Sequence, residues 1–265
     1  MKRTQLQKAE AFRALHEGDP FLIPNPWDAG SARVLAALGF EALATTSGGF
    51  AFTLGRQDGN VTLDEVAAHV RALDEATDLP VSVDLENGYG PDPEDAVRAI
   101  TRAAEAGGVG ASIEDYDRGG EIYDHDHAAE RVAAAAEAAH GLGFPFTLTA
   151  RAENHIRGNP DLDDTVARLV AYEGAGADVL YAPGLRTGEE IRAVREATSK
   201  PLNVLALPGM SMSEITEAGA QRVSVGSGLT WAAASALANA AQRLRDEGDF
   251  SALTSSAKIR ELFGD

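Results

Sequence analysis

The chain has 265 residues, of which 44% are hydrophobic and 24% charged, as expected for a globular protein with a large core. Its formal net charge of −18 argues against nucleic acid and against an anionic membrane surface as partners. The absence of cysteine excludes disulfides, thiolate metal sites and a cysteine nucleophile. No apolar run approaches ~20 residues and the N-terminal residues lack an apolar signal core, so we expect a cytoplasmic protein with no membrane span.

Strand-like and helix-like stretches alternate along the whole chain. Eight short apolar segments predict strands, at residues 21–25, 42–46, 80–85, 110–114, 146–151, 178–182, 202–206 and 222–226. The stretches between them carry helix signals: Thr62 with Glu65 fits a capping box, and Pro93 fits a first helical position. Short loops between such elements predict repeated βα units and a parallel sheet.

A glycine recurs where a predicted helix meets the next strand, at Gly39, Gly107, Gly176 and Gly219. Each suits the left-handed cap that ends a helix. Eight βα units imply an α/β fold of the closed (β/α)₈ TIM type. The alternative, an open doubly wound sheet, would normally place a glycine-rich phosphate loop after its first strand, and residues 24–31 do not form one.

The C-terminal part continues beyond the eighth unit. An alanine-rich helix is predicted from residue 230 to 247, followed by a break at Gly248 and a second helix over 250–262. We therefore divide the chain into a barrel, 1–229, and two C-terminal helices, 230–265, of the same domain. A helix left over after barrel closure must pack somewhere, and a neighbouring subunit is a reasonable place.

Acidic residues end two neighbouring predicted strands, and an arginine ends the next. Residues 83–90 form a buried strand that runs into Asp84 and Glu86, which are two apart and would share a strand face. The following strands end in Glu114 and Arg151. Because the carboxyl ends of barrel strands build the active site, we expect these side chains to meet there. Crowded carboxylates favour a cation between them, and Mg²⁺ prefers a few carboxylates plus waters.

Structural explanations exist for the same residues. The two carboxylates of residues 83–90 would then only cap the following turn, and Glu114 would pair with Arg151 in a structural salt bridge. Thr46, Ser47 and Gly48 follow the second strand, and such small residues leave backbone N–H groups free to cradle a carboxylate or phosphate. An ordinary polar turn is the alternative for that loop.

Together these pieces resemble the isocitrate lyase / phosphoenolpyruvate mutase superfamily. The similar segments follow the family's order, at residues 25–33, 45–48, 54–59, 83–90, 110–115, 149–153 and 201–204. The resemblance implies a barrel whose last helix is swapped between subunits, in a homotetramer built as a dimer of helix-swapped dimers. It also implies a small anionic carboxylate substrate.

The resemblance further implies roles for individual residues. Asp84 would be the principal ligand of Mg²⁺ (or Mn²⁺), and Glu86 and Glu114 would hold the waters of the metal. Arg151 would act in catalysis as the cation on the substrate's carboxylate or oxyanion. Substrate contacts are further implied for five residues: Thr46, Ser47, Gly48, Asp58 and Asn203. In this family the metal and the arginine stabilise an enolate of pyruvate or of a similar 2-oxo acid.

The chain also departs from the best-known members. Isocitrate and methylisocitrate lyases use a cysteine in a lysine-rich lid, and this chain has no cysteine. Phosphoenolpyruvate mutases and phosphonopyruvate hydrolases carry a lysine and an asparagine in the lid, and residues 115–140 hold neither. The mutases also have a histidine near the end of the sixth strand, where residues 181–184 stand here. We therefore predict a Mg²⁺-dependent lyase or decarboxylase that cleaves a C–C bond in a small 2-oxo or 2-hydroxy acid. A P–C bond enzyme and a non-catalytic 2-oxo acid binder are the alternatives.

Residues 115–127 form the loosest region, and their length and glycines suit a lid over the strand ends. Without the cysteine, another group must supply the proton. The candidates are Tyr116, Tyr123, His125 and His127 of the lid, with Tyr89 on the neighbouring strand end. We favour Tyr116 because it directly follows the acidic strand end. If it only packs beneath the lid, water on the metal becomes the proton source.

Overall fold

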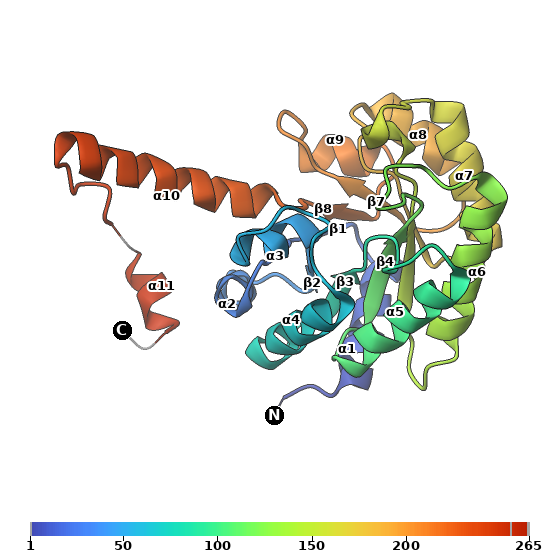
Figure 1. The fold of residues 1–265 in the computed structure, drawn as a ribbon, viewed down its shortest axis with the longest axis horizontal. Helices are drawn as coiled ribbons and strands as arrows, with labels where there is room; N and C mark the ends of the chain where they lie inside the picture. Colours follow the sequence, from blue (N-terminus) through green and yellow to red (C-terminus); the bar gives the residue numbers. More distant parts are fainter. Residues whose placement is uncertain (1, 255, 264–265) are drawn as a thin grey trace.

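A computed structural model describes residues 2–254 and 256–263. Its eight strands form one parallel sheet in the order β1-β8-β7-β6-β5-β4-β3-β2. The strands are Phe21–Ile23 (β1), Leu43–Ala44 (β2), Val81–Asp84 (β3), Gly110–Glu114 (β4), Thr147–Arg151 (β5), Val179–Tyr181 (β6), Leu202–Leu205 (β7) and Arg222–Ser224 (β8). Each lies within a predicted segment, and the predicted (β/α)₈ barrel is confirmed (Figure 1).

The barrel closes between β1 and β2 through bonds just beyond β1. The Ala44 amide donates to the Pro24 carbonyl at 3.1 Å. The Asn25 side chain donates to the Thr45 carbonyl at 3.0 Å and accepts from the Val225 amide at 3.0 Å. One asparagine thus ties the first two strands to the segment after β8 at the carboxyl end of the barrel.

Helices cover the outside of the sheet. Those between strands are α2 (Ala29–Ala37), α3 (Ser47–Thr53), α4 (Leu63–Ala76), α5 (Pro93–Glu105), α6 (His125–His140), η1 (Asn154–Arg157), α7 (Leu162–Gly174), α8 (Gly188–Ala197) and α9 (Met212–Glu217). The predicted capping box of Thr62 with Glu65 is present at the start of α4. The four inter-unit glycines have φ between 92° and 109°, so the predicted left-handed caps are confirmed. Among the described residues, no helix is both long and apolar enough to cross a membrane.

A further helix, α1 (Gln5–Glu17), packs across the amino ends of the strands. Its Phe12 is fully buried in a cluster with Phe21 and Val109, which lie at the starts of strands. The Arg222 side chain, from the first residue of β8, bonds to His16 of the same helix at 3.2 Å. We call Lys8, Phe12 and His16 of α1, together with Arg222, the barrel floor.

The C-terminal helix α10 (Gly228–Glu247) projects away from the barrel, and α11 (Ala257–Glu261) returns toward α2 (Figure 1). The predicted helix over 250–262 is too long: Asp249 accepts from the Ser251 amide at 2.8 Å, and this turn delays the helix to Ala257. Contacts of α11 with its own α2 run through Arg33, which lies 4.6 Å from the ring of Phe263. Residues 1, 255, 264 and 265 of the predicted ranges lie outside the described residues.

Candidate active site

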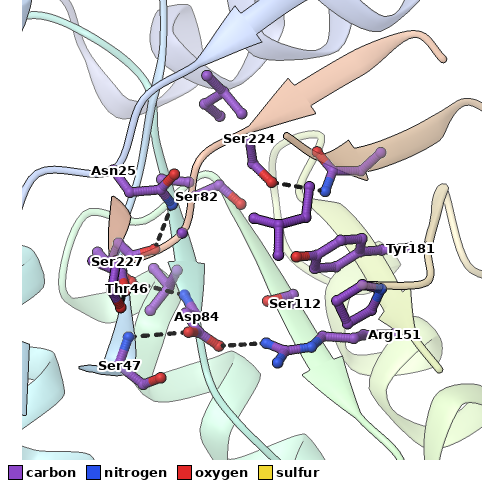
Figure 2. A pocket seen from close by; sticks show the side chains of 18 of the residues that line it. Asn25, Thr46, Ser47, Ser82, Asp84, Ser112, Arg151, Tyr181, Ser224 and Ser227 are labelled. Atoms are coloured by element: carbon purple, nitrogen blue, oxygen red, sulfur yellow. Dashed lines mark hydrogen bonds and ion pairs between the residues drawn. The ribbon is translucent and has the colours of Figure 1, made fainter. Parts of the chain in front are cut away.

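Two neighbouring cavities lie at the carboxyl ends of the strands. The first, which we call the barrel pocket, has a volume of about 200 Å³ and is lined by residues of all eight strands (Figure 2). The second, which we call the lid-side chamber, has a volume of about 250 Å³ and lies under the loop after β4. Ser47, Asp58 and Arg151 line both, so the two cavities form one candidate site.

Asp84 ends β3 and faces the barrel pocket (Figure 2). Its Oδ2 accepts from the Ser47 amide at 3.0 Å, and its Oδ1 lies 3.7 Å from Nη1 of Arg151. Ser47 is the first residue of α3, so the positive end of a helix faces this carboxylate. The Asp84 amide donates to Thr45 Oγ1 at 2.8 Å, which fixes the backbone beneath it. The carboxylate is therefore held in place and points into the pocket.

Arg151 ends β5 between two carboxylates. Its Nη1 lies 3.2 Å from Glu114 Oε2, and its Nε bonds to the fully buried Glu153. Burial works against the charge, but Glu114 and Glu153 outweigh it and raise the pKa of Arg151. The Glu114–Arg151 ion pair that was the structural alternative is thus present, and it presents a permanently charged guanidinium to both cavities.

Glu86 does not share a strand face with Asp84, contrary to the prediction from spacing. β3 ends at Asp84, and Glu86 has left-handed backbone with φ 49°. Its Oε1 accepts from Arg118 Nη2 at 3.0 Å and from the Tyr89 hydroxyl at 3.3 Å. It therefore lines the lid-side chamber, whereas Asp84 lines the barrel pocket.

The carboxylates of the site destabilise one another. Burial raises the pKa of Glu86 to about 7, and the charges of Asp84 and Asp58 add to the rise against the opposing Arg118. Burial also raises the pKa of Glu114, against Arg151, with Asp84 again contributing. A cation beside Asp84 would relieve both, and donors that are all carboxylate oxygens suit Mg²⁺ or Mn²⁺.

The donors are not collected into a ready ligand set. Among the described residues, no three His, Asp or Glu side chains are grouped closely enough to hold a metal ion. Glu86 and Glu114 instead face Arg118 and Arg151. Mg²⁺ keeps several waters and binds through one or two carboxylates, so Asp84 with water-mediated help fits it.

The small-residue loop after β2 packs closely against the segment after β8. Thr46 Oγ1 lies 2.8 Å from Ser227 Oγ. A Cβ on Gly48 would lie 2.8 Å from Ser227 Oγ and 3.2 Å from Asp58 Oδ2, so any larger residue would have to displace these two side chains. Thr46, Ser47 and Asp58 line the barrel pocket. The structure thus brings the predicted cradle beside Asp84, and its contact with substrate stays a prediction.

Asn203 of β7 also lines the barrel pocket, but both ends of its amide are engaged. Its Oδ1 accepts from Arg222 Nε at 2.8 Å, and its Nδ2 donates to Ser224 Oγ at 3.1 Å. Direct substrate binding by Asn203 therefore stays a prediction.

The lid is anchored at its base and carries Tyr116. Asp115 accepts from Arg168 at 3.0 Å and from the Tyr172 hydroxyl at 2.5 Å. Tyr116 pairs with Ile122 across the loop and lines the lid-side chamber, with the Arg157 guanidinium 3.8 Å from its ring centre. Its role as proton donor stays a prediction.

The other candidate donors lie elsewhere. His125 bonds to Asp164 at 2.6 Å and His127 to the Pro91 carbonyl at 2.9 Å, and neither lines the two cavities. The Tyr123 hydroxyl accepts from Asn87 at 3.1 Å.

Sequence reasoning missed three residues of the site. Arg118 and Arg157 line the lid-side chamber, and Arg222 reaches the bottom of the barrel pocket. The signal for Arg222 was available, because Arg222 and Ser224 alternate with Val223 on a predicted strand and must face inward if the valine faces the helices. No pattern in the loop sequences predicted a place in the site for Arg118 or Arg157.

Residues 12–245 match the family model described as phosphoenolpyruvate phosphomutase. The chain is 30% identical over 261 residues to 2-methylisocitrate lyase of Halalkalibacterium halodurans, which covers 93% of this chain and 85% of that protein. It is also 30% identical over 250 residues to an oxaloacetate decarboxylase of Rhodopseudomonas palustris BisB5, with coverage of 89% and 84%.

Solved structures share the fold closely. A lyase or mutase candidate from Burkholderia cenocepacia J2315 superposes with a TM-score of 0.94 at 50% identity, covering 98% of this chain and 97% of that one. A phosphonopyruvate hydrolase solved with oxalate and Mg²⁺ has a TM-score of 0.86 at 24% identity, with coverage of 97% and 95%.

Proposed function

We propose that this chain, which belongs to the phosphoenolpyruvate phosphomutase family, is a Mg²⁺-dependent lyase or decarboxylase that cleaves a C–C bond in a small 2-oxo or 2-hydroxy carboxylic acid through an enolate. The family match and the two curated relatives make it an enzyme of the isocitrate lyase / phosphoenolpyruvate mutase superfamily. One observation carries the proposal: a fixed carboxylate on Asp84 and a fixed guanidinium on Arg151, 3.7 Å apart, facing one polar pocket.

The roles follow from charge and position. Arg151 binds the substrate carboxylate or the developing enolate oxygen, and because Glu114 and Glu153 already orient it, little reorganisation is needed. The loop at Ser47 and Gly48 cradles the rest of the anion. Bound Mg²⁺ or Mn²⁺ would act as a Lewis acid that stabilises enolate charge, held by Asp84 with Glu86 and Glu114 acting through water.

Decarboxylation or C–C cleavage suits this site better than P–C chemistry. Carbon dioxide leaves without further help, so only the enolate needs stabilising. Residues 115–140 offer neither lysine nor asparagine to a phosphoryl group, and the lid cation is Arg118, which is paired with Glu86. The arginine and carboxylates around the pocket argue against a non-catalytic binder.

A substrate panel tests the reaction. Oxaloacetate, 2-methylisocitrate, substituted malates and phosphonopyruvate would be incubated with the protein and Mg²⁺ and followed by ¹H and ³¹P NMR. We expect a carboxylic acid to yield a 2-oxo acid product, with no turnover in EDTA. Arg151→Lys should lower turnover by roughly 10²-fold or more, because lysine cannot reproduce the oriented fork. The exposed Arg71→Lys is the matched control. Turnover of phosphonopyruvate alone would contradict the proposal.

We also propose that the C-terminal helices dock on a second copy of the chain, in a dimer of helix-swapped dimers. Trp231 and Leu237 of α10 are 55% and 70% exposed, and Phe250 beyond it is 69% exposed. Within α10 the buried residue is Thr230. Removal of the residues after Glu247 should lower the number of chains per particle, as measured by light scattering. An unchanged oligomer would remove the swap.

A further inference from the structure

Tyr181 is the last residue of β6, and its hydroxyl points into the barrel pocket (Figure 2). In that view it lies above Arg151 and across from Asp84. The Arg151 guanidinium lies 5.5 Å from the centre of its ring. Among the described residues that line this pocket, Tyr181 is the one with an aromatic hydroxyl. Its hydroxyl therefore shares the pocket with both charged groups, Asp84 and Arg151.

A chain of hydrogen bonds runs through β7 and β8 beside Tyr181, whose register partner on β7 is Asn203. An arginine can only donate, so Arg222 Nε–H to Asn203 Oδ1 at 2.8 Å sets the orientation of the Asn203 amide. The amide Nδ2 must then donate to Ser224 Oγ, at 3.1 Å.

The nearby Ser224 hydroxyl opposes the rise that burial causes in the pKa of Tyr181. The hydroxyl of Tyr181 faces the pocket that Asp84 and Arg151 also line (Figure 2).

We propose that Tyr181 is the proton donor to the enolate carbon, an assignment that rests on the proposed function. When C–C cleavage has left a pyruvate-type enolate, the phenol O–H bond breaks and a C–H bond forms at C3. The electron pair of the O–H bond stays on the phenolate oxygen, while the enolate becomes the 2-oxo acid. A proton from solvent restores the phenol after product leaves.

The surroundings of Tyr181 suit both halves of this step. Burial raises its pKa to about 12, so it is protonated at neutral pH and ready to donate. The Arg151 cation and the Ser224 hydroxyl favour the phenolate once it forms. Tyr116 lines the other cavity, with its ring beneath Arg157, so the two tyrosines can be separated by mutation.

The test uses pyruvate itself and needs no knowledge of the leaving group. Exchange of the C3 protons of pyruvate in D₂O with Mg²⁺, followed by ¹H NMR, runs the proton step in both directions. Tyr181→Phe should slow the protein-dependent exchange by roughly 10²–10⁴-fold. Binding of oxalate, an enolate analogue with no proton to exchange, should stay within about 3-fold of the parent by calorimetry, because the phenol proton is not needed to hold it.

Two further variants keep the result decisive. Ser224→Ala retains the phenol but removes a nearby hydroxyl that favours the phenolate, and should slow exchange by roughly 5-fold. It also serves if Tyr181→Phe does not fold. Tyr116→Phe is the comparator, and its loss should be at least about 10-fold smaller than that of Tyr181→Phe.

The outcomes distinguish failure of the Tyr181 assignment from failure of the proposed function. Parental exchange in Tyr181→Phe and in Ser224→Ala, or a larger loss in Tyr116→Phe, overturns the assignment and leaves the proposed function standing. A parent protein that neither binds oxalate with Mg²⁺ nor exchanges pyruvate protons overturns the proposed function, and this assignment with it.

Discussion

The two ends of the barrel treat charge in opposite ways. At the carboxyl end, Asp84, Glu86 and Glu114 crowd around arginines, and burial raises the pKa of two of these acids. At the barrel floor, Arg222 is buried but bonds only to neutral acceptors, among them His16 and Thr149. Crowded like charges cost stability and invite a ligand. The charges of the floor are instead satisfied, Arg222 by neutral groups and Lys8 by Asp74 at 2.7 Å, and they need none. This is the division of a (β/α)₈ barrel into a reactive face and a stabilising face.

The largest expected effect is at the floor. Phe12→Ala removes a fully buried ring from the cluster beneath the sheet and should lower the free energy of unfolding by about 3–5 kcal/mol. Activity per folded molecule should be unchanged, because Phe12 lines neither cavity. Urea unfolding and assays below the melting temperature measure the two. Loss of activity without loss of stability would break the division between the ends.

The next effect concerns Glu86 and has the opposite sign. Its pKa is about 7 in the fold against 4.5 when unfolded, so the folded protein holds this proton longer and stability is lost as pH rises from about 4.5 to 7. In EDTA, Glu86→Gln should therefore raise the free energy of unfolding by about 3 kcal/mol at pH 8 and by little at pH 4.5. Destabilisation at pH 8 would mean that the Arg118 pair outweighs burial.

The smallest effect is the pH response of the floor. Burial, then the Arg222 charge, lower the pKa of His16 to about 3, so the unfolded chain takes up a proton first and stability is lost as pH falls below about 6.5. His16→Gln should remove this dependence, roughly 2 kcal/mol between pH 7 and pH 5. Unfolding free energies of both proteins at the two pH values give the difference. An equal slope in the variant would show that His16 is not the titrating group.

Much of the fold could be predicted from sequence, and the reasons are local. Apolar segments of five or six residues recur eight times, helix caps mark several of the helices between them, and a glycine ends four of these helices. Each signal acts over a few residues. The extent of α11 could not be predicted, because a side-chain turn at Asp249 competes with the helix. The meeting of Asp84, Glu114 and Arg151 could likewise be predicted, because each lies at the end of a predicted strand.

The finer arrangement of the site lay beyond sequence patterns. Glu86 turns away from Asp84 because the strand stops two residues earlier, and a period of two holds only within a strand. Arg118 and Arg157 reach the lid-side chamber from loops, where no periodicity fixes direction. The preference for Tyr116 rested on closeness in sequence, whereas Tyr181 lies beside Arg151 as its register partner on the neighbouring strand and faces the pocket that Asp84 lines (Figure 2).

Binding of oxalate in the presence of Mg²⁺ tests the central claim most directly. The parent and Asp84→Asn would be titrated by calorimetry, with Asp78→Asn, an exposed aspartate before the same strand, as the matched control. The account predicts that the parent and the control bind oxalate with Mg²⁺ and not with EDTA, and that Asp84→Asn binds at least about 10-fold more weakly. Equal affinity in all three proteins, or binding that ignores Mg²⁺, would contradict it.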